Sequence, residues 1–227
     1  MLVEVIVTNV EEAITAEKYG ANRLELIHAF DLGGLSPRLE LSKEVCSAVS
    51  IPVNVMVRPH GHSFLYDIKD MQTILLEIDY LITHTEVNDI VFGALNEKNE
   101  VAFGQLEIII KHIEKTKHGI TFHRAIDESK DVFTAFRELH NYKEFVKRAL
   151  TSGGKETAME GIDTIFQMQH FAENEGITVL AGSGIKPENA RDLISKTRVK
   201  EIHLGTGLRT NGKLDQAKFV KLNENIN

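Results

Sequence analysis

Residues 53–58 read Val-Asn-Val-Met-Val-Arg, and this stretch contains the pattern from which the fold is inferred. Successive side chains of a β-strand point to opposite faces, so the three valines share one face while Asn54, Met56 and Arg58 share the other. Such a strand needs an apolar layer on one side and a partly polar interior on the other. The wall of a closed barrel surrounded by helices meets this requirement.

Short apolar runs of this kind recur along the chain, and helical patterns alternate with them. The runs cover residues 3–7, 23–27, 53–58, 89–93, 119–124, 145–150, 177–182 and 201–204. The helical patterns cover residues 10–19, 67–83, 103–117, 131–142, 159–174, 187–196 and 214–222. One more helix is expected to begin at Ser36-Pro37, where a capping serine precedes a proline at the first helical position.

This alternation predicts parallel strands joined by right-handed crossovers. Eight units in 227 residues come close to the size of a (β/α)8 barrel, which is about 250 residues. We therefore expect an α/β fold with one TIM-barrel domain over residues 1–227. An open doubly wound sheet is the alternative, but no GxGxxG motif follows the first strand, and the glycine-rich loops follow late strands instead.

The composition excludes several classes of protein. The chain has 26 Lys+Arg against 33 Asp+Glu and no basic run, which argues against nucleic acid as a partner. Its one cysteine, Cys46, can form neither an internal disulfide nor a multi-cysteine metal site. No apolar stretch approaches the ~20 residues that span a bilayer, and residues 1–5 lack the basic start of a signal peptide. A cytoplasmic protein without a membrane partner is expected.

The alternation also places polar side chains inside the barrel. Besides Arg58, the inward-facing polar residues are predicted to be Glu4, Glu25, Asn54, Thr121, His123 and His203. Buried charges are costly unless they are paired, so Glu4 or Glu25 is expected to face Arg58. Two interpretations remain open, namely an internal salt bridge that only fills the barrel and a site at the C-terminal ends of the strands.

Histidines gather at these predicted strand ends. Five of the ten histidines lie at or just after the C-terminal end of a strand: His28, His60, His62, His123 and His203. His123 is a candidate for proton transfer or for orienting a substrate oxygen. The candidate catalytic residues are Glu25, Arg58, His123 and Arg124. His60 and His62 form an H-x-H pair, but the spacing reveals no third ligand, so no metal site is predicted.

Glycine-rich loops follow the last three predicted strands. Glycine lets backbone N–H groups approach an anion, and phosphate sites of barrels are commonly built after strands seven and eight. The candidate anion-binding residues are Ser152, Gly153, Gly182, Ser183, Gly184, Gly205 and Thr206. We predict a phosphate or carboxylate site there; the alternative is that the glycines only make tight turns.

Several motifs resemble those of the CutC family, whose members are described as copper homeostasis proteins. The motifs, spread over nearly the whole chain, are residues 20–26 (GANRLEL), 33–37 (GGLSP), 51–53, 57–59, 64–66, 91–95 (VFGAL), 121–125 (TFHRA), 150–153 (LTSG) and 158–161 (AMEG). The resemblance implies a TIM barrel that is cytoplasmic and often oligomeric. It suggests copper as a ligand only through the name of the family.

The chain departs from the family pattern where copper ligands have been proposed. Many members carry cysteines at the ends of strands one and two, and the matching positions here are Ile6 and Ile27. Cu(I) prefers soft thiolate or thioether ligands, so a Cu(I)–thiolate site is not expected in this chain. His60, His62 and Ser63 stand where an arginine, a glycine and an aspartate are usual, and residues 205–207 (Gly-Thr-Gly) replace a stretch similar to Ser-Ala-Arg.

Three functions follow from these patterns. The first is a cytoplasmic role in copper homeostasis through copper binding or trafficking. The second is an enzyme that acts on a small phosphorylated or carboxylated metabolite, with His123 as the acid/base and Glu25 and Arg58 as a polarising pair. The third is a barrel used as a scaffold. The expected partners are copper or a small anionic metabolite, and further copies of the same chain.

Overall fold

The computed structural model describes residues 1–173 and 176–226, which form one closed barrel of eight parallel strands. The strands are β1 Leu2–Val7, β2 Arg23–Leu26, β3 Val53–Met56, β4 Asp89–Phe92, β5 Ile120–Phe122, β6 Val146–Thr151, β7 Thr178–Ala181 and β8 Glu201–Leu204. Pairing of β1 with β8, in which Glu4 lies opposite His203, closes the sheet. The predicted TIM barrel is confirmed, and the open doubly wound alternative is wrong.

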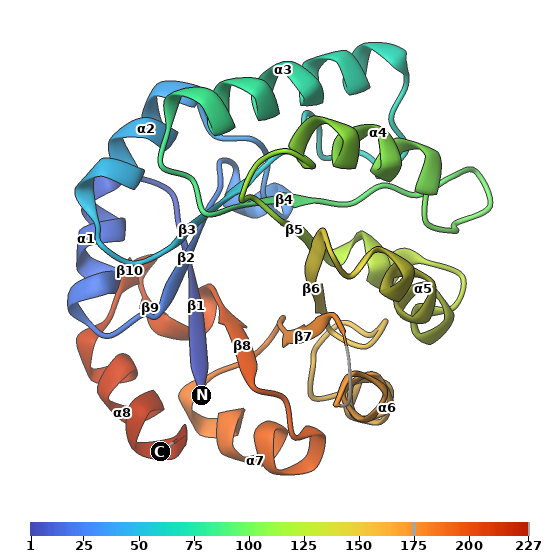
Figure 1. Cartoon of the computed structure of the whole chain (residues 1–227). Coiled ribbons are helices and arrows are strands. Elements are labelled where there is room, and N and C mark those ends of the chain that lie inside the picture. The colour runs from blue at the N-terminus through green and yellow to red at the C-terminus, as the bar shows by residue number, and fades with distance from the viewer. Residues whose placement is uncertain (174–175, 227) are drawn as a thin grey trace.

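Helices surround the strands in sequence order (Figure 1). They are α1 Val10–Lys18, α2 Leu39–Ala48, α3 Ile68–His84, α4 Phe103–Ile113, α5 Val132–Leu139, α6 Ile162–Ala172, α7 Pro187–Thr197 and α8 Gln216–Ile226. The last helix closes the ring, because Phe219 of α8 packs edge-on against Tyr19, the residue that follows α1, at 5.4 Å between ring centroids. None of the helices in the described ranges is long and apolar enough to cross a bilayer.

Short elements complete the loops. Four 3-10 helices, η1 Phe30–Leu32, η2 Arg124–Glu128, η3 His140–Tyr142 and η4 Thr206–Leu208, lie between the main elements. A small hairpin, β9 Arg209–Thr210 and β10 Lys213–Leu214, precedes α8. Three of these 3-10 helices, η1, η2 and η4, follow strands directly, so they help to shape the loops at the C-terminal end of the barrel.

Helix α3 shows how the sequence builds the outer layer. Asp67 accepts the backbone N–H of Asp70, and the Asp70 carboxylate accepts the N–H of Asp67, which makes a capping box. Met71, Ile74, Ile78 and Leu81 then recur at helical spacing and are buried against the sheet. Each such side chain stabilises the fold by about 1.5–3 kcal/mol when it is fully buried.

Apolar side chains form two separate groups. The larger group lies between the strands and the helices and includes Val53, Val55 and Val57. The smaller group lies inside the barrel and consists of Ile27, Met56 and Val91, with Ile6 and Phe30 packed against it. The alternation predicted for residues 53–58 is therefore confirmed, since the valines face the helices while Met56 faces the interior.

Several predicted helix boundaries differ from the structure; for example, α4 ends at Ile113 rather than at residue 117, and α8 ends at Ile226 rather than at residue 222. The second helix begins at Leu39 and not at Ser36-Pro37, because the Ser36 hydroxyl accepts the backbone N–H of Arg58 at 2.8 Å and donates to Glu77 at 2.7 Å. Ser36 thus ties the end of β3 to α3 instead of capping a helix. The sixth helix begins at Ile162 rather than at residue 159. Its predicted end at Asn174 lies outside the described residues.

Candidate active site

A cavity of about 210 Å³ opens at the C-terminal end of the barrel. It has polar and apolar sides. The polar residues that line it include Glu25, Arg58, His123, Arg124, Ser183, His203 and Thr206, and the glycines include Gly184, Gly205 and Gly207. The apolar lining includes Ile6, Ile27, Phe30, Met56, Phe64 and Leu150. All four predicted catalytic residues therefore reach one small cavity.

A line of three side chains runs from the wall of this cavity, at Glu25 and His203, to Glu4 in the barrel interior. The Nδ1 atom of His203 lies 2.9 Å from Oε1 of Glu4, and its Nε2 atom lies 3.4 Å from Oε2 of Glu25. All three side chains are at least nine-tenths buried. Because one imidazole bridges two carboxyl groups, the charge of Glu25 is coupled to that of Glu4 through His203.

Charged side chains from four strands continue the network toward the other end of the barrel. Arg23 binds both Glu4 and Glu201. Arg148 in turn lies 3.4 Å from Glu201 and 2.7 Å from Asp89. Asn54 donates to Glu4 at 3.2 Å, and Thr121 accepts from Arg148 at 3.4 Å. Of the polar residues predicted to face the interior, Glu4, Asn54 and Thr121 are buried below the cavity and do not line its wall.

The surroundings shift the pKa values of this group in different directions. Burial opposes ionisation of Glu4, but the nearby charge of Arg23 and the hydrogen bond from His203 outweigh it, so its pKa falls to about 2. Burial raises the pKa of Glu25 to about 7, although the charge of His203 partly offsets this. For His203 burial lowers the pKa, but the two carboxyl groups outweigh it and the net shift is upward. Glu25 is therefore the carboxyl group that exchanges its proton near neutral pH.

His123 is held in one tautomer by the start of η2. Its Nδ1 atom accepts the backbone N–H of Ala125 at 3.1 Å, so the neutral ring carries its proton on Nε2. Burial, together with the positive charge of Arg58, lowers the pKa of His123 to about 3. The ring is therefore neutral near pH 7, and it presents a hydrogen-bond donor rather than a base.

Arg58 holds two loops at the barrel mouth together. Its guanidinium donates to the carbonyl oxygens of Leu32 and Gly34, at 3.1 and 3.3 Å, and to that of Gly61 at 3.4 Å. Its Cζ atom lies 4.4 Å from the ring centroid of Phe64, within the range of a cation–π contact. Among the described residues, the ion-pair partner of Glu25 is His203 and not Arg58. The expected pairing of Glu4 or Glu25 with Arg58 is therefore wrong.

An internal carboxylate fills the glycine-rich loop after β6. Asp127 accepts the backbone N–H groups of Ser152 and Gly154 at 3.0 Å, as well as the hydroxyl groups of Thr151 and Ser152. Gly153 donates its N–H to the Thr151 hydroxyl at 2.8 Å. Ser152 and Gly154 thus bind an anion that belongs to the protein itself, and the N–H of Gly153 is used by Thr151. Ser152 and Gly153 do not line the cavity, which corrects their assignment as ligand-binding residues.

Arg124 lies at the rim above this loop. Its Nε atom is 2.8 Å from Asp127, and a terminal nitrogen donates to the Ser152 hydroxyl at 2.9 Å. The side chain is 42% exposed, so it can contact a ligand that enters the cavity.

The loops after β7 and β8 come together at the opposite side of the cavity. A Cβ atom added to Gly207 would lie 2.0 Å from the carbonyl oxygen of Ile185, so only glycine allows these two loops to pack this closely. Ser183, Gly184, Gly205 and Thr206 all line the cavity, as expected of anion-binding residues. Gly182 does not line the cavity, and its N–H is not free to bind a ligand, since it donates to the Thr151 carbonyl oxygen at 2.9 Å.

The histidine pair after β3 and the single cysteine lie elsewhere. His60 and His62 stack at 3.7 Å between ring centroids, and His60 contacts Asp70 at 3.2 Å. Cys46 is buried in α2, and burial together with the nearby charge of Glu86 raises the pKa of its thiol to about 11. Within the described ranges, no cluster of three or more His, Cys, Asp or Glu side chains is arranged to hold a metal ion.

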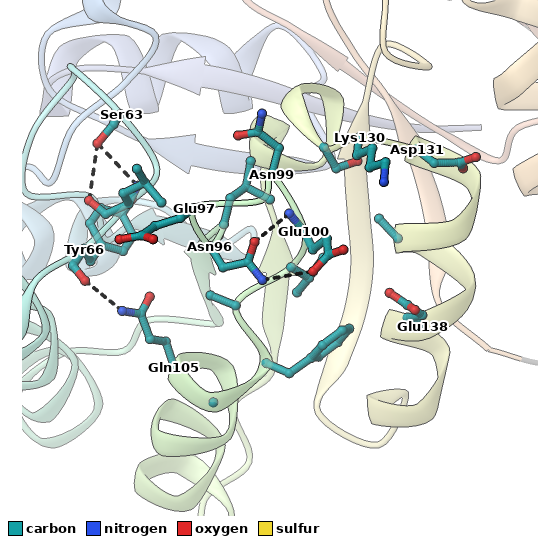
Figure 2. A pocket seen from close by; sticks show the side chains of 18 of the residues that line it. Ser63, Tyr66, Asn96, Glu97, Asn99, Glu100, Gln105, Lys130, Asp131 and Glu138 are labelled. Carbon is teal, nitrogen blue, oxygen red and sulfur yellow. Dashed lines mark hydrogen bonds between the residues drawn. The ribbon is translucent and has the colours of Figure 1, made fainter.

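A wider groove of about 1300 Å³ lies outside the barrel, between the loops that follow β3 and β4 and the start of α5 (Figure 2). Its polar side chains largely bind one another or nearby backbone. Asn96 bonds with Glu100, Ser63 bonds with the backbone of Leu65, and Gln105 donates to the carbonyl oxygen of Tyr66. The groove contains no residue of the Glu4–His203–Glu25 line, so the barrel mouth is the better candidate.

Sequence reasoning missed several residues of the site. Arg23 lies two residues before Glu25 in the same strand, so both side chains point to the same face of the sheet. This alternation is enough to predict that Arg23 faces the barrel interior. The others include the charged residues Asp89 and Arg148 and the aromatic residues Phe30 and Phe64. Phe30 and Phe64 lie in loops, where no alternation identifies the face that a side chain takes.

Comparisons with known proteins agree with this architecture. The model of the CutC family matches residues 1–208. A CutC family protein from Glaesserella parasuis serovar 5 (strain SH0165) is 34% identical over 222 residues, 98% of this chain and 89% of the relative. One from Pasteurella multocida (strain Pm70) is 35% identical over 210 residues, 92% and 84% of the two chains.

Solved structures show the same fold. A CutC protein from Streptococcus agalactiae, named for copper homeostasis, superposes with a TM-score of 0.82 at 25% identity, covering 92% of this chain and all of the other. Phosphoribosyl anthranilate isomerase from Thermotoga maritima reaches a TM-score of 0.64 at 15% identity, covering 99% of this chain and 98% of the other, and shares the barrel fold alone. The family match and the curated relatives agree along the chain, which belongs to the CutC family.

Proposed function

We propose that the barrel mouth is the active site of an enzyme that moves a proton on a small anionic metabolite, with Glu25 as the proton carrier. One observation carries the proposal. Glu25 lines the cavity, Oε2 faces His203, and the other oxygen is buried without a hydrogen-bond partner among the described residues. A carboxyl group with a pKa of about 7 is half ionised at neutral pH, which suits both giving and taking a proton.

The rest of the cavity suits a small anionic ligand. Its volume of about 210 Å³ lies below the ~300 Å³ typical of drug-sized ligands and fits a metabolite of a few carbon atoms. Arg58 and Arg124 contribute positive charge to the lining. Gly184, Gly205 and Thr206 bring backbone groups to the opposite wall, where a phosphate or carboxylate group would be held.

The tautomer of His123 changes the role that the sequence suggested for it. Proton transfer at neutral pH is assigned to Glu25, because the His123 pKa of about 3 makes the ring a poor base. His123 instead donates a hydrogen bond from Nε2 to an oxygen of the ligand. His203 acts as a positioning residue, since it bridges Glu25 to the ionised Glu4.

Copper homeostasis, for which the family is named, is the second candidate function. Under our proposal, a role in copper homeostasis is exerted through the metabolite and not through a Cu(I)–thiolate site. The ligand chemistry supports this choice, because Ile6 and Ile27 line the cavity where many family members carry cysteines. The raised pKa of Cys46 also keeps its thiol protonated at neutral pH.

The proposal also covers the setting in which the protein works. It includes a cytoplasmic location, where small anionic metabolites are available and a lone cysteine stays reduced. It also includes a homo-oligomeric state, as the family resemblance suggests.

Calorimetric titration with 2-phosphoglycolate, which carries both a phosphate and a carboxylate group, tests the proposal. An anion in the cavity disfavours ionised Glu25, so binding is expected to take up protons, and affinity should fall as the pH rises through about 7. Glu25→Gln should bind the probe without this pH dependence. The exposed Glu44, changed to Gln, is the matched control and should behave as the wild type.

Two outcomes would contradict the proposal. One is that 2-phosphoglycolate fails to bind or binds without proton uptake. The other is that Cu(I), titrated under reducing conditions, binds tightly and equally to the wild type and to Glu25→Gln, which would favour direct copper handling instead.

A further inference from the structure

We infer that the cavity takes a carbonyl compound with an acidic C–H bond next to the carbonyl group, and that it stabilises the enolate of this compound. Glu25 moves the proton, while His123 Nε2–H and Arg58 Nε–H bind the carbonyl oxygen. The inference rests on the proposed function and names the substrate class of the same site.

Unpartnered buried atoms point to this ligand. Eight buried side-chain nitrogen or oxygen atoms of the described residues have no hydrogen-bond partner. Three of them belong to residues that line the cavity: Glu25 Oε1, Arg58 Nε and His123 Nε2. A buried polar atom without a partner is costly, so three such atoms on residues that line one cavity indicate a ligand that supplies the missing partners.

The chemistry of the three atoms defines what this ligand must offer. Arg58 Nε always carries a hydrogen, because the guanidinium does not lose its proton in proteins. His123 Nε2 carries the proton of the neutral ring, since Nδ1 accepts the N–H of Ala125. His123 Nε2–H therefore awaits an acceptor oxygen, and the Arg58 guanidinium, which also lies close to the Tyr66 hydroxyl, supplies a second donor. The carboxyl group of Glu25 awaits a proton to exchange. A carbonyl group with an adjacent C–H bond offers both.

The charge arrangement favours a carbonyl over a permanent carboxylate at this position. A carboxylate would carry its full charge next to ionised Glu25 from the moment of binding. A carbonyl group becomes negative only as Glu25 removes the neighbouring proton, when the Glu25 charge is neutralised. Interactions that strengthen as charge develops lower the barrier, and the positive charge of Arg58 contributes in this way.

The apolar part of the cavity supports the same chemistry. Phe30 and Phe64 lie in the loops above the cavity, while Ile6, Ile27 and Met56 belong to the interior wall of the barrel. An apolar wall excludes water, and hydrogen bonds to a developing charge are stronger where water is excluded. It also prevents quenching of the enolate by bulk solvent.

The reaction balances without a further reactant. The ionised Glu25 oxygen forms an O–H bond as the C–H bond breaks; the electron pair of the C–H bond forms the new C=C bond, and the π pair of the C=O bond moves onto the carbonyl oxygen. His123 Nε2–H and Arg58 Nε–H hold this oxygen by hydrogen bonds. Glu25 then returns the proton to the same carbon, which gives exchange. Where that carbon carries a hydroxyl group, the hydroxyl proton can move to the former carbonyl oxygen while Glu25 protonates the former carbonyl carbon, which gives an isomer.

Hydrogen–deuterium exchange in D2O, followed by proton NMR, tests the inference. The probes are dihydroxyacetone phosphate and pyruvate, which carry a phosphate and a carboxylate group beside an enolisable carbonyl. The protein should accelerate exchange of at least one of them. Glu25→Gln should lower the rate at least about 100-fold, the usual contribution of general acid–base catalysis. Glu44→Gln should leave it unchanged.

A second measurement separates the oxygen-binding donors from the proton carrier. Phosphoglycolohydroxamate, a planar mimic of an enediolate, should bind at least about 10-fold more tightly than 2-phosphoglycolate. His123→Phe keeps a ring of similar volume but lacks the donor, so it should lose this preference while still binding 2-phosphoglycolate. Arg58→Met tests the other donor, and its thermal unfolding is recorded because Arg58 also holds the mouth loops.

The outcomes distinguish the two proposals. Proton-linked binding of 2-phosphoglycolate with no accelerated exchange of either probe, and no preference for the hydroxamate, overturns the enolate inference and leaves the proposed function standing. Failure to bind 2-phosphoglycolate removes both. Exchange that persists undiminished in Glu25→Gln overturns the role of Glu25 in particular.

Discussion

Replacing Glu25 by glutamine should make the protein more stable at alkaline pH than the wild type. The folded protein holds the Glu25 proton with a pKa of about 7, whereas the unfolded chain holds it with the ordinary value of 4.5. Between these values the folded state binds more protons, so the free energy of unfolding of the wild type falls as the pH rises. The glutamine side chain cannot ionise, so the free energy of unfolding of the variant does not fall with pH for this reason.

The size of the effect follows from the shift. The two pKa values, about 7 and 4.5, differ by about 2.5, and at about 1.4 kcal/mol for each pH unit this difference corresponds to about 3.5 kcal/mol over the full titration. The free energy of unfolding of Glu25→Gln, relative to the wild type, should therefore rise by about 3 kcal/mol between pH 4 and pH 8. Most of the rise should fall between pH 4.5 and pH 7.

Urea denaturation at a series of pH values measures this difference directly. Glu44→Gln, at an exposed position of α2, serves as the control and should show a pH profile parallel to that of the wild type. A stability difference between Glu25→Gln and the wild type that stays constant from pH 4 to pH 8 would refute the argument. It would mean that Glu25 ionises in the folded protein as easily as it does in water.

Three more predictions concern the network, the mouth loops and the thiol. Arg23→Met leaves Glu4 buried without its main counter-charge and should cost about 3–5 kcal/mol in urea denaturation, and combining it with Glu4→Gln should recover part of the loss. Gly207→Ala should lower the thermal stability and weaken 2-phosphoglycolate binding, because the added Cβ atom would clash with the backbone of Ile185. Gly104 in α4 has open space around it, so Gly104→Ala should instead raise the free energy of unfolding by about 0.5–1 kcal/mol. Cys46 should react with a thiol reagent far more slowly in the folded protein than in urea, and fast reaction of the folded protein would contradict its burial.

The barrel and the parity of its strands could be predicted because both depend on local alternation. Residues 53–58 show this, since one face of the strand packs against helices and the other faces the interior. The same rule placed His203 and Glu25 inside. It also applied to Arg23, which shares the parity of Glu25.

The partners of the buried charges could not be predicted in the same way. Parity gives the face of a strand but not the height of a residue along the barrel. In the structure Glu4 lies level with Arg23 on one side and His203 on the other, whereas Arg58 lies beyond the end of β3. Height depends on the stagger between strands, which the sequence of a single strand does not reveal.

The loops depended on contacts between distant segments. The glycines after β6 predicted a site for an anionic ligand. The structure shows that the anion there is the Asp127 carboxylate, which comes from η2 in the loop after β5. Ser36 looked like a helix cap, yet its hydroxyl is used by Arg58 and Glu77. Both the glycine-rich loop and the Ser36 hydroxyl make hydrogen bonds of the kind that the sequence predicts. Their partners lie in distant segments, which sequence spacing could not identify.

Counting formal charges inside the barrel explains why one carboxyl group is left to titrate. Arg23, Arg148 and protonated His203 supply three positive charges, and Glu4, Asp89 and Glu201 supply three negative ones. Glu25 is the seventh member and shares its cation, His203, with Glu4. Binding or releasing a proton at Glu25 therefore switches these seven residues between neutrality and a single excess negative charge, and the positive charge of Arg58 in the wall of the same cavity adds to either sum.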